Sequence, residues 1–316
     1  MSNRKRKAMK ITLFALTVCV ALLSLSGCAL MENKRPNVNK EGNPYHIGLV
    51  LSNRENPFFE LLANGAMNEA QNQGVKLTVV DSKDNSDTEY AHIQGLVESR
   101  VDFIVVNPVD SDTVYKTIQY ANDADIPVLT VDRTANGGQV VCHIASDNQA
   151  GGALIAEYLL ERSGNKGSYA EMRGLDGTSA AQTRSKGFND VMLQKSNMSQ
   201  SAVVTADFNR QMAKEVMANL LVVHPKLTAI FAHNDEMALG ASEVALSLNK
   251  DVLIFGFDGT DEALQAVENG TLAATVAQQP IKMGETSILR AIDFLSGKAI
   301  ESEVLVDVKL IKKTSN

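Results

Sequence analysis

The sequence predicts an α/β protein with two lobes, each built on a doubly wound parallel sheet. From residue 45 onward, short β-branched runs alternate with amphipathic segments of helical length. Strands and helices that alternate at this pitch form parallel sheets with right-handed crossovers. The number of predicted strands would make a single sheet unusually wide, so we expect two sheets.

The first 28 residues have the pattern of a bacterial lipoprotein signal. Arg4, Lys5, Arg6, Lys7 and Lys10 precede an apolar run at 11–23, and the run leads into Leu25-Ser26-Gly27-Cys28. This lipobox predicts cleavage before Cys28 and transfer of a diacylglycerol to its thiolate. The alternative is a retained signal anchor, but the apolar run is shorter than the roughly 20 residues that span a bilayer. We therefore expect residues 1–27 to be removed and the chain to be anchored outside the cytoplasm.

Residues 28–44 are expected to be a flexible tether between the lipid and the fold. The segment is polar, rich in Asn, Lys and Pro, and has nothing to bury.

The first half of the folded region is predicted to alternate regularly between strands and helices. Strands are expected at 47–51, 76–80, 103–107 and 128–132, with helices at 58–73, 88–100 and 112–124 between them.

The second half repeats this alternation. The expected strands are 139–145, 168–173, 203–205, 229–232, 253–257, 274–277 and a last strand at 304–311; the expected helices are 148–162, 180–194, 210–223, 236–247, 262–268 and 283–295.

Charge and cysteine content exclude several classes of function. Removal of the signal takes away five basic residues, so 25 Lys+Arg remain against 37 Asp+Glu and the net charge is −12. Such a charge disfavours nucleic acid or an anionic membrane surface as a partner. Cys19 leaves with the signal and Cys28 carries the lipid, so Cys142 is expected to be a lone buried thiol that packs without reacting.

Polar and aromatic residues collect just after the predicted strands. Ligands of open parallel sheets bind beyond the carboxyl ends of the strands, where these residues lie. Planar polar side chains can hold neighbouring hydroxyl groups by two bonds, and aromatic rings cover the apolar face of a sugar ring. The predicted sugar site consists of Ser52, Asn56, Phe58, Phe59, Asp132, Arg133, Arg184, Phe208, Asn234, Asp258 and Gln278.

Each of these residues also has a simpler interpretation. Asn56 and Asp258 could cap helices, and one of the neighbours Phe58 and Phe59 would normally face the core. Asp132 and Asp258 could instead be the acid and base of a glycoside hydrolase, although nothing in the sequence fixes their separation. The sequence lacks a nucleophile elbow, a phosphate loop and a dinucleotide fingerprint, and its five histidines lack metal-ligand spacing. His233 could edge the pocket, but a structural role at a strand end is the simpler interpretation. We expect no enzymatic activity, cofactor or metal.

Four stretches of the chain resemble the type I periplasmic binding proteins, the solute receptors of bacterial ABC importers. They are NPFFELLANGA, HIASDNQAGG, FAHNDEMALGA and IFGFDGTDEALQAVENGTLAATVAQQP. The similarity extends from about residue 47 to the C-terminus and is strongest to family members that bind D-ribose, whose pocket residue types match all eleven positions named above. His233 departs from the family pattern because a Gln is common there.

The resemblance implies two lobes that close over a sugar. It places the hinge crossings near 146–147, 278–279 and 307–308, so that one lobe contains 45–146 with 279–307 and the other 147–278 with 308–316. It also implies a partner permease that recognises the closed form. We expect a monomer, and whether a chemoreceptor also binds it stays open.

Three other functions compete with a ribose receptor. A sugar-responsive repressor domain shares the fold, but a lipoprotein signal stands where its basic helix-turn-helix would be. A receptor for another pentose, allose or a furanose-like signal would differ in a few pocket residues. The hydrolase that uses Asp132 and Asp258 is the third.

Overall fold

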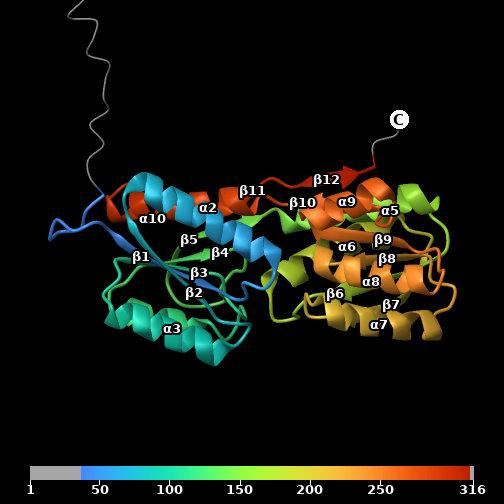
Figure 1. Ribbon diagram of the computed structural model, residues 1–316, viewed down its shortest axis with the longest axis horizontal. Helices are drawn as coiled ribbons and strands as arrows, with labels where there is room; N and C mark the ends of the chain where they lie inside the picture. Colours follow the sequence, from blue (N-terminus) through green and yellow to red (C-terminus); the bar gives the residue numbers. More distant parts are fainter. Residues whose placement is uncertain (1–36, 314–316) are drawn as a thin grey trace, which may run out of the picture. The chain divides into compact units, whose positions relative to one another are not determined.

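The computed structural model describes residues 37–313, which contain two six-stranded sheets (Figure 1). The strand order is β11-β5-β4-β3-β1-β2 in the first sheet and β12-β10-β9-β8-β6-β7 in the second. The predicted signal, Cys28 and most of the predicted tether lie outside the described residues.

The first lobe is a parallel sheet covered by two helices on each face. Apolar side chains of α2 and α10 pack on one face together with Leu49, Phe103 and Val105, while those of α3 and α4 cover the other. The elements are β1 (His46–Leu51), α2 (Pro57–Gln73), β2 (Lys76–Asp81), α3 (Ser86–Glu98), β3 (Phe103–Val106), α4 (Tyr115–Asp123), β4 (Val128–Val131), β5 (Val140–Ser146), α10 (Pro280–Leu295) and β11 (Glu303–Val306).

The second lobe repeats this plan. Helices α5 and α6 pack on one face of its sheet around Phe188, Phe231 and Phe255, and α7, α8 and α9 cover the other face (Figure 1). The elements are α5 (Asn148–Ser163), β6 (Ser168–Arg173), α6 (Ser179–Lys195), β7 (Ser199–Thr205), α7 (Arg210–Val223), β8 (Ala229–Ala232), α8 (Asp235–Ser247), β9 (Leu253–Asp258), α9 (Asp261–Asn269), β10 (Ala274–Ala277) and β12 (Lys309–Lys312).

The chain passes between the two lobes three times. It leaves the first sheet after β5, returns between β10 and α10, and crosses again between β11 and β12. The last crossing corrects the single strand predicted at 304–311. Residues 303–306 pair in parallel with β5, whereas residues 309–312 pair antiparallel with β10. A continuous β-branched pattern does not record that its two halves belong to different sheets.

The end of the predicted tether is more ordered than its composition suggested. Val38 and Pro44 form an isolated antiparallel bridge, and the Asn37 side chain donates to the carbonyl oxygen of Gln73 at 2.9 Å. Asn39 accepts hydrogen bonds from the backbone of Glu41 and Asn43, which closes a turn. Residues 37–44 are therefore part of the first lobe's surface.

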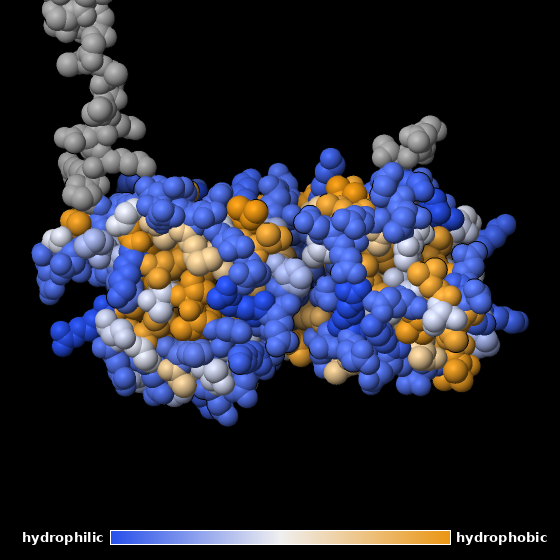
Figure 2. Space-filling view, in the orientation of Figure 1, coloured by the Kyte–Doolittle hydropathy of each residue, from blue (hydrophilic) through white to orange (hydrophobic). Residues whose placement is uncertain are grey.

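On the face shown in Figure 2, most of the exposed residues are hydrophilic. Figure 2 shows a mostly hydrophilic face, with apolar residues gathered between α2 and α3 where the core reaches the surface. Within residues 37–313, none of the helices combines the length and apolar character needed to cross a bilayer.

Candidate functional site

Ten of the eleven predicted site residues line one cavity between the two lobes, together with Ala180. The space between these residues is ≈ 260 Å³, part of it open to solvent, which suits a small molecule. The ten predicted residues are Asn56, Phe58, Phe59, Asp132, Arg133, Arg184, Phe208, Asn234, Asp258 and Gln278.

Ser52 is the predicted residue that does not line this cavity. It is fully buried, and its backbone N–H donates to Asn107 Oδ1 at 3.2 Å. Asn107 in turn donates to the Val131 carbonyl oxygen and, at 3.4 Å, to Asp132 Oδ2. Ser52 and Asn107 thus lie beneath Asp132 and help to fix its carboxyl.

The first lobe contributes an adjacent acid and base. Asp132 and Arg133 follow β4, both are 3% exposed, and Arg133 Nε lies 3.9 Å from Asp132 Oδ2. Arg133 Nη1 donates to the carbonyl oxygens of Pro108 and Val109, at 3.1 and 3.3 Å. The loop after β3 therefore holds this guanidinium in place.

The second lobe contributes a matching pair from two different elements. Arg184 of α6 lies 3.9 Å from Asp258 at the end of β9. Its Nε donates to Asn148 Oδ1 at 2.8 Å and its Nη1 to the His233 carbonyl oxygen at 2.6 Å. Gln278 Nε2 donates to Asp258 Oδ1 at 2.7 Å, and the other carboxyl oxygen, Oδ2, does not take part in this bond.

His233 supports the site from behind and does not line the cavity. Its ring is fully buried, and Nε2 lies 3.0 Å from Glu171 Oε1. Burial lowers the pKa of His233, while the hydrogen bond to Glu171 and the charge of that carboxyl act in the opposite direction. The expectation of a structural imidazole is confirmed.

Aromatic rings lie against the two guanidinium groups. The Arg133 guanidinium carbon is 5.3 Å from the centroid of Phe59 and 5.6 Å from that of Phe208, and Arg184 is 3.9 Å from Phe257. Phe58 and Phe59 meet edge to face at 5.2 Å, and both line the cavity. The alternative, in which one ring faces the core and only the other faces the cleft, does not fit this arrangement.

Several polar atoms in the cavity wall are buried without a hydrogen-bond partner. Among the described residues these atoms include Asp132 Oδ1, Arg133 Nε, Asp258 Oδ2 and Gln278 Oε1. A buried polar atom without a partner costs about 1 to 3 kcal/mol, more when it is charged. The cavity is therefore complementary to a small molecule that carries several hydroxyl groups.

Burial also controls the charges of the site. It raises the pKa of Asp132 and raises that of Asp258 well above the ordinary value, while the nearby arginines act in the opposite direction. For Asp132 the opposing charges are Arg184 and Arg133; for Asp258 the main one is Arg184. The arginines thus favour the charged form of each carboxyl, and burial opposes it.

Four non-glycine residues at the site have a left-handed backbone. The φ angles are 65° at Asp132, 52° at Asp207, 60° at Phe208 and 136° at Asp258. Such angles are unfavourable for residues with a Cβ and often occur at functional sites. They turn the chain sharply after a strand, so that the side chains reach the cavity.

Three hydrogen bonds join the lobes beside the cavity, and we call them the interlobe bridge. Ser111 N–H donates to the Gly177 carbonyl oxygen at 2.9 Å. Ser179 N–H donates to Ser111 Oγ at 3.2 Å, and Thr134 N–H donates to Ser179 Oγ at 2.9 Å. The structure therefore has its lobes in contact on this side.

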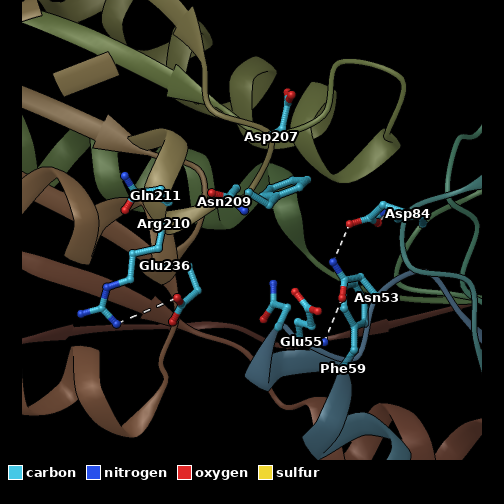
Figure 3. Close-up of a pocket in the computed structure, with 12 residues that line it drawn as sticks. Asn53, Glu55, Phe59, Asp84, Asp207, Asn209, Arg210, Gln211 and Glu236 are labelled. Atoms are coloured by element: carbon cyan, nitrogen blue, oxygen red, sulfur yellow. Dashed lines mark hydrogen bonds and ion pairs between the residues drawn. The ribbon is translucent and has the colours of Figure 1, made fainter. Parts of the chain in front are cut away.

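A second and larger hollow, with ≈ 760 Å³ of space on the same measure, lies at the mouth of the cleft and is partly open to solvent (Figure 3). It shares Asn56, Phe59, Arg133 and Phe208 with the cavity. Side chains from the two lobes face each other across it, and its labelled polar members include Asn53, Glu55, Asp84, Asp207, Asn209 and Glu236. Its charged residues are four acids, Glu55, Asp84, Asp207 and Glu236, and two bases, Arg133 and Arg210, so the mouth is acidic overall.

Helix capping explains part of the predicted set. Asn56 accepts from Phe58 N–H and Asn234 from Met237 N–H, so both are N-caps as well as cavity residues. Asp258 is not a cap, because Thr260 occupies that position for α9. Asn107, which directly follows β3, and Asn148, the first residue of α5, were missed, although a search of the positions just after each strand would have selected them.

Comparison with known proteins places the chain in a family. Residues 47–299 match the model of a periplasmic binding protein domain. The chain is 43% identical over 269 residues to the ribose import binding protein of Escherichia coli, covering 84% of this chain and 90% of that protein. It is 38% identical over 296 residues to the ribose import binding protein of Bacillus subtilis, covering 92% and 95%.

A solved structure agrees with these relatives. A periplasmic solute binding protein of an ABC transporter from Actinobacillus succinogenes, with bound D-allose, has a TM-score of 0.80 at 26% identity and covers 85% of this chain and 98% of that one. Its fold corresponds to the one described above. The chain therefore belongs to the type I periplasmic binding protein family, whose members are solute-binding components of transport systems and not enzymes.

Proposed function

We propose that this protein is a sugar receptor of an ABC importer, that its sugar is D-ribose, and that it works outside the cytoplasm, anchored to the membrane through a lipid on Cys28. In this proposal a permease receives the sugar from the closed form. The residues proposed to contact the sugar are the ten predicted members of the cavity wall.

The observation that carries the proposal is the set of buried polar atoms without partners. Asp132 and Arg133 present such atoms from one lobe, and Asp258 and Gln278 present them from the other. Hydroxyl groups both donate and accept, so a sugar can satisfy acidic and basic atoms together. Phe58, Phe59 and Phe208 supply rings for the apolar faces of the ligand.

Ribose is favoured by the relatives. Two relatives at 38% and 43% identity are ribose import binding proteins. D-allose is the competing ligand, since a similar structure holds it, although that protein is less similar in sequence.

Closure of the lobes follows from the composition of the site. Because both lobes contribute sugar contacts, only the closed form makes all of them, and the sugar shifts the population toward it. The three crossings between the lobes are the places where the backbone can bend.

A binding panel tests the proposal. The full chain, purified in detergent, is titrated calorimetrically with D-ribose, 2-deoxy-D-ribose, D-allose and D-glucose. Ribose should bind tightest, and 2-deoxyribose at least about tenfold more weakly, because a missing hydroxyl strands a buried partner. Tighter binding of a hexose would replace ribose by that sugar, and no binding of any sugar would refute the receptor.

The lipid anchor is tested separately. Cys28→Ala should leave an unprocessed precursor, because the thiol that accepts the diacylglycerol is missing. Mass spectrometry of membrane and soluble fractions reports both the cleavage and the acyl chain. Acylation or cleavage at this bond in the variant would refute the anchor without affecting the sugar proposal.

A further inference from the structure

Glu89 is a buried carboxyl close to the site but outside the cavity wall. It lies in the first turn of α3 and is 1% exposed. Its Oε2 accepts a hydrogen bond from Val109 N–H at 2.7 Å. Among residues 37–313, no Lys, Arg or His forms an ion pair with it within 4 Å.

The peptide of Val109 connects Glu89 to Arg133. Val109 donates its N–H to Glu89 and accepts from Arg133 Nη1 through its carbonyl oxygen. The neighbouring carbonyl oxygen of Pro108 accepts from the same nitrogen. Fixing Val109 therefore fixes two of the acceptors that hold the guanidinium.

Charge acts in the same direction as this hydrogen-bond chain. The charged groups that act on Glu89 are Arg133 from the end of β4 and Asp110 from the loop after β3, and its own helix contributes none. Arg133 is in turn attracted by Asp132, Asp84, Glu89 and Asp110. An ionised Glu89 thus draws Arg133 toward the loop, whereas a neutral one does not.

We propose that Glu89 is a positioning residue for Arg133 and that it holds this guanidinium in its sugar-binding orientation best as a carboxylate. The inference rests on the proposed sugar site. In this role Glu89 does not touch the sugar, and its ionisation makes the sugar affinity depend on pH.

The direction of that dependence follows from the surroundings of Glu89. Burial raises the pKa of Glu89 to about 7, against smaller opposing effects of the Val109 hydrogen bond and Arg133. Above this pH the carboxylate is a strong acceptor and attracts Arg133; below it both effects weaken. Sugar affinity should therefore fall as the pH drops through 7.

The test compares the full chain with two variants by calorimetric titration with D-ribose at pH 8.5, 7.0 and 5.5. Glu89→Gln keeps the shape and one acceptor oxygen but cannot ionise. Glu98→Gln is the control, because Glu98 is exposed near the other end of the same helix. We expect the wild type to bind about fivefold more weakly at pH 5.5 than at pH 8.5, since a hydrogen bond to a charged group is about twice as strong as a neutral one.

Glu89→Gln should bind about fivefold more weakly than the wild type at pH 8.5 and equally at pH 5.5, while Glu98→Gln should follow the wild type throughout. A purely structural role would lower the affinity of Glu89→Gln by the same factor at every pH, and that result would overturn the inference. Equal affinities of Glu89→Gln and wild type at pH 8.5 would also overturn it. Even if Glu89→Gln does not fold, a wild-type affinity that is constant from pH 8.5 to 5.5 would overturn the inference. Absence of sugar binding in the wild type would instead refute the proposed function.

Discussion

The interlobe bridge should contribute directly to sugar affinity. Two of its three hydrogen bonds use a side-chain oxygen as acceptor: Ser179 Oγ accepts from Thr134 N–H, and Ser111 Oγ accepts from Ser179 N–H. Ser179→Ala and Ser111→Ala each remove one acceptor. Thr178, and not Ser179, is the N-cap of α6, so Ser179→Ala leaves the cap intact.

The size of the effect follows from the net value of a hydrogen bond. Each bond contributes about 1 kcal/mol, and in a closing receptor it forms only when the lobes meet. Loss of one bond should therefore weaken ribose about fivefold, since about 1.4 kcal/mol is tenfold. The double variant should lose up to about thirtyfold, with some non-additivity because both bonds involve Ser179. The third bond joins backbone atoms of Ser111 and Gly177 and survives both changes.

Calorimetric titration of the full chain measures the ribose affinity, and hydrogen exchange at the Thr134 amide reports whether the bond to Ser179 is formed. The amide should exchange slowly in the sugar-bound wild type and faster in bound Ser179→Ala. Ser247→Ala is the control, because that hydroxyl is exposed and bonds only within α8. Affinity changes below twofold in both single variants, with unchanged exchange at Thr134, would refute the reasoning.

Three further predictions concern stability and the cavity wall. Burial lowers the pKa of His143 from 6.5 to about 4. The unfolded chain therefore takes up this proton at a higher pH than the folded chain, and the free energy of unfolding should fall by up to about 3 kcal/mol as the pH drops from 6.5 toward 4. In urea unfolding, His143→Gln should lack this loss, and a loss equal to that of the wild type would contradict the assignment. Gly152→Ala would bring a Cβ onto the Arg184 carbonyl oxygen, so it should lower the free energy of unfolding by about 1 to 3 kcal/mol and also weaken ribose; a variant with wild-type stability and affinity would show that α5 and α6 can separate freely. Phe208→Ala should weaken ribose about tenfold or more in calorimetry, because the ring lies near both Arg133 and Arg184; an unchanged affinity would remove Phe208 from the site.

Periodicity and strand-end chemistry predicted most of the fold and of the cavity wall. The helix at Arg210–Val223 was predicted with its observed bounds. Its apolar spacing indicates a helix, and the proline after His224 indicates where that helix ends. The division of residues 303–312 between two sheets could not be predicted from the pattern, since strand propensity is local and sheet membership is not.

Parts of the site also could not be predicted from the sequence, because they depend on tertiary contacts. Asp132 and Arg184 were selected by residue type and position, and both line the cavity. The hydrogen bond from Val109 to Glu89 and the interlobe bridge each use a backbone N–H whose acceptor lies far away in the sequence, so residue type and periodicity do not reveal them. Ala180 could not have been selected either, because a small apolar residue at a helix start carries no chemical signal.

The left-handed backbone at Asp132, Asp207, Phe208 and Asp258 has a consequence for protein engineering. Glycine would adopt the backbone angles of each of these positions with less strain, above all at Asp258, where φ is 136°. A library of variants selected only for resistance to heat should therefore accumulate glycine or asparagine at these positions and lose its sugar affinity as it gains stability. Any thermostable biosensor made from this receptor would have to hold these four residues fixed and take its stability from helix ends and surfaces away from the cleft.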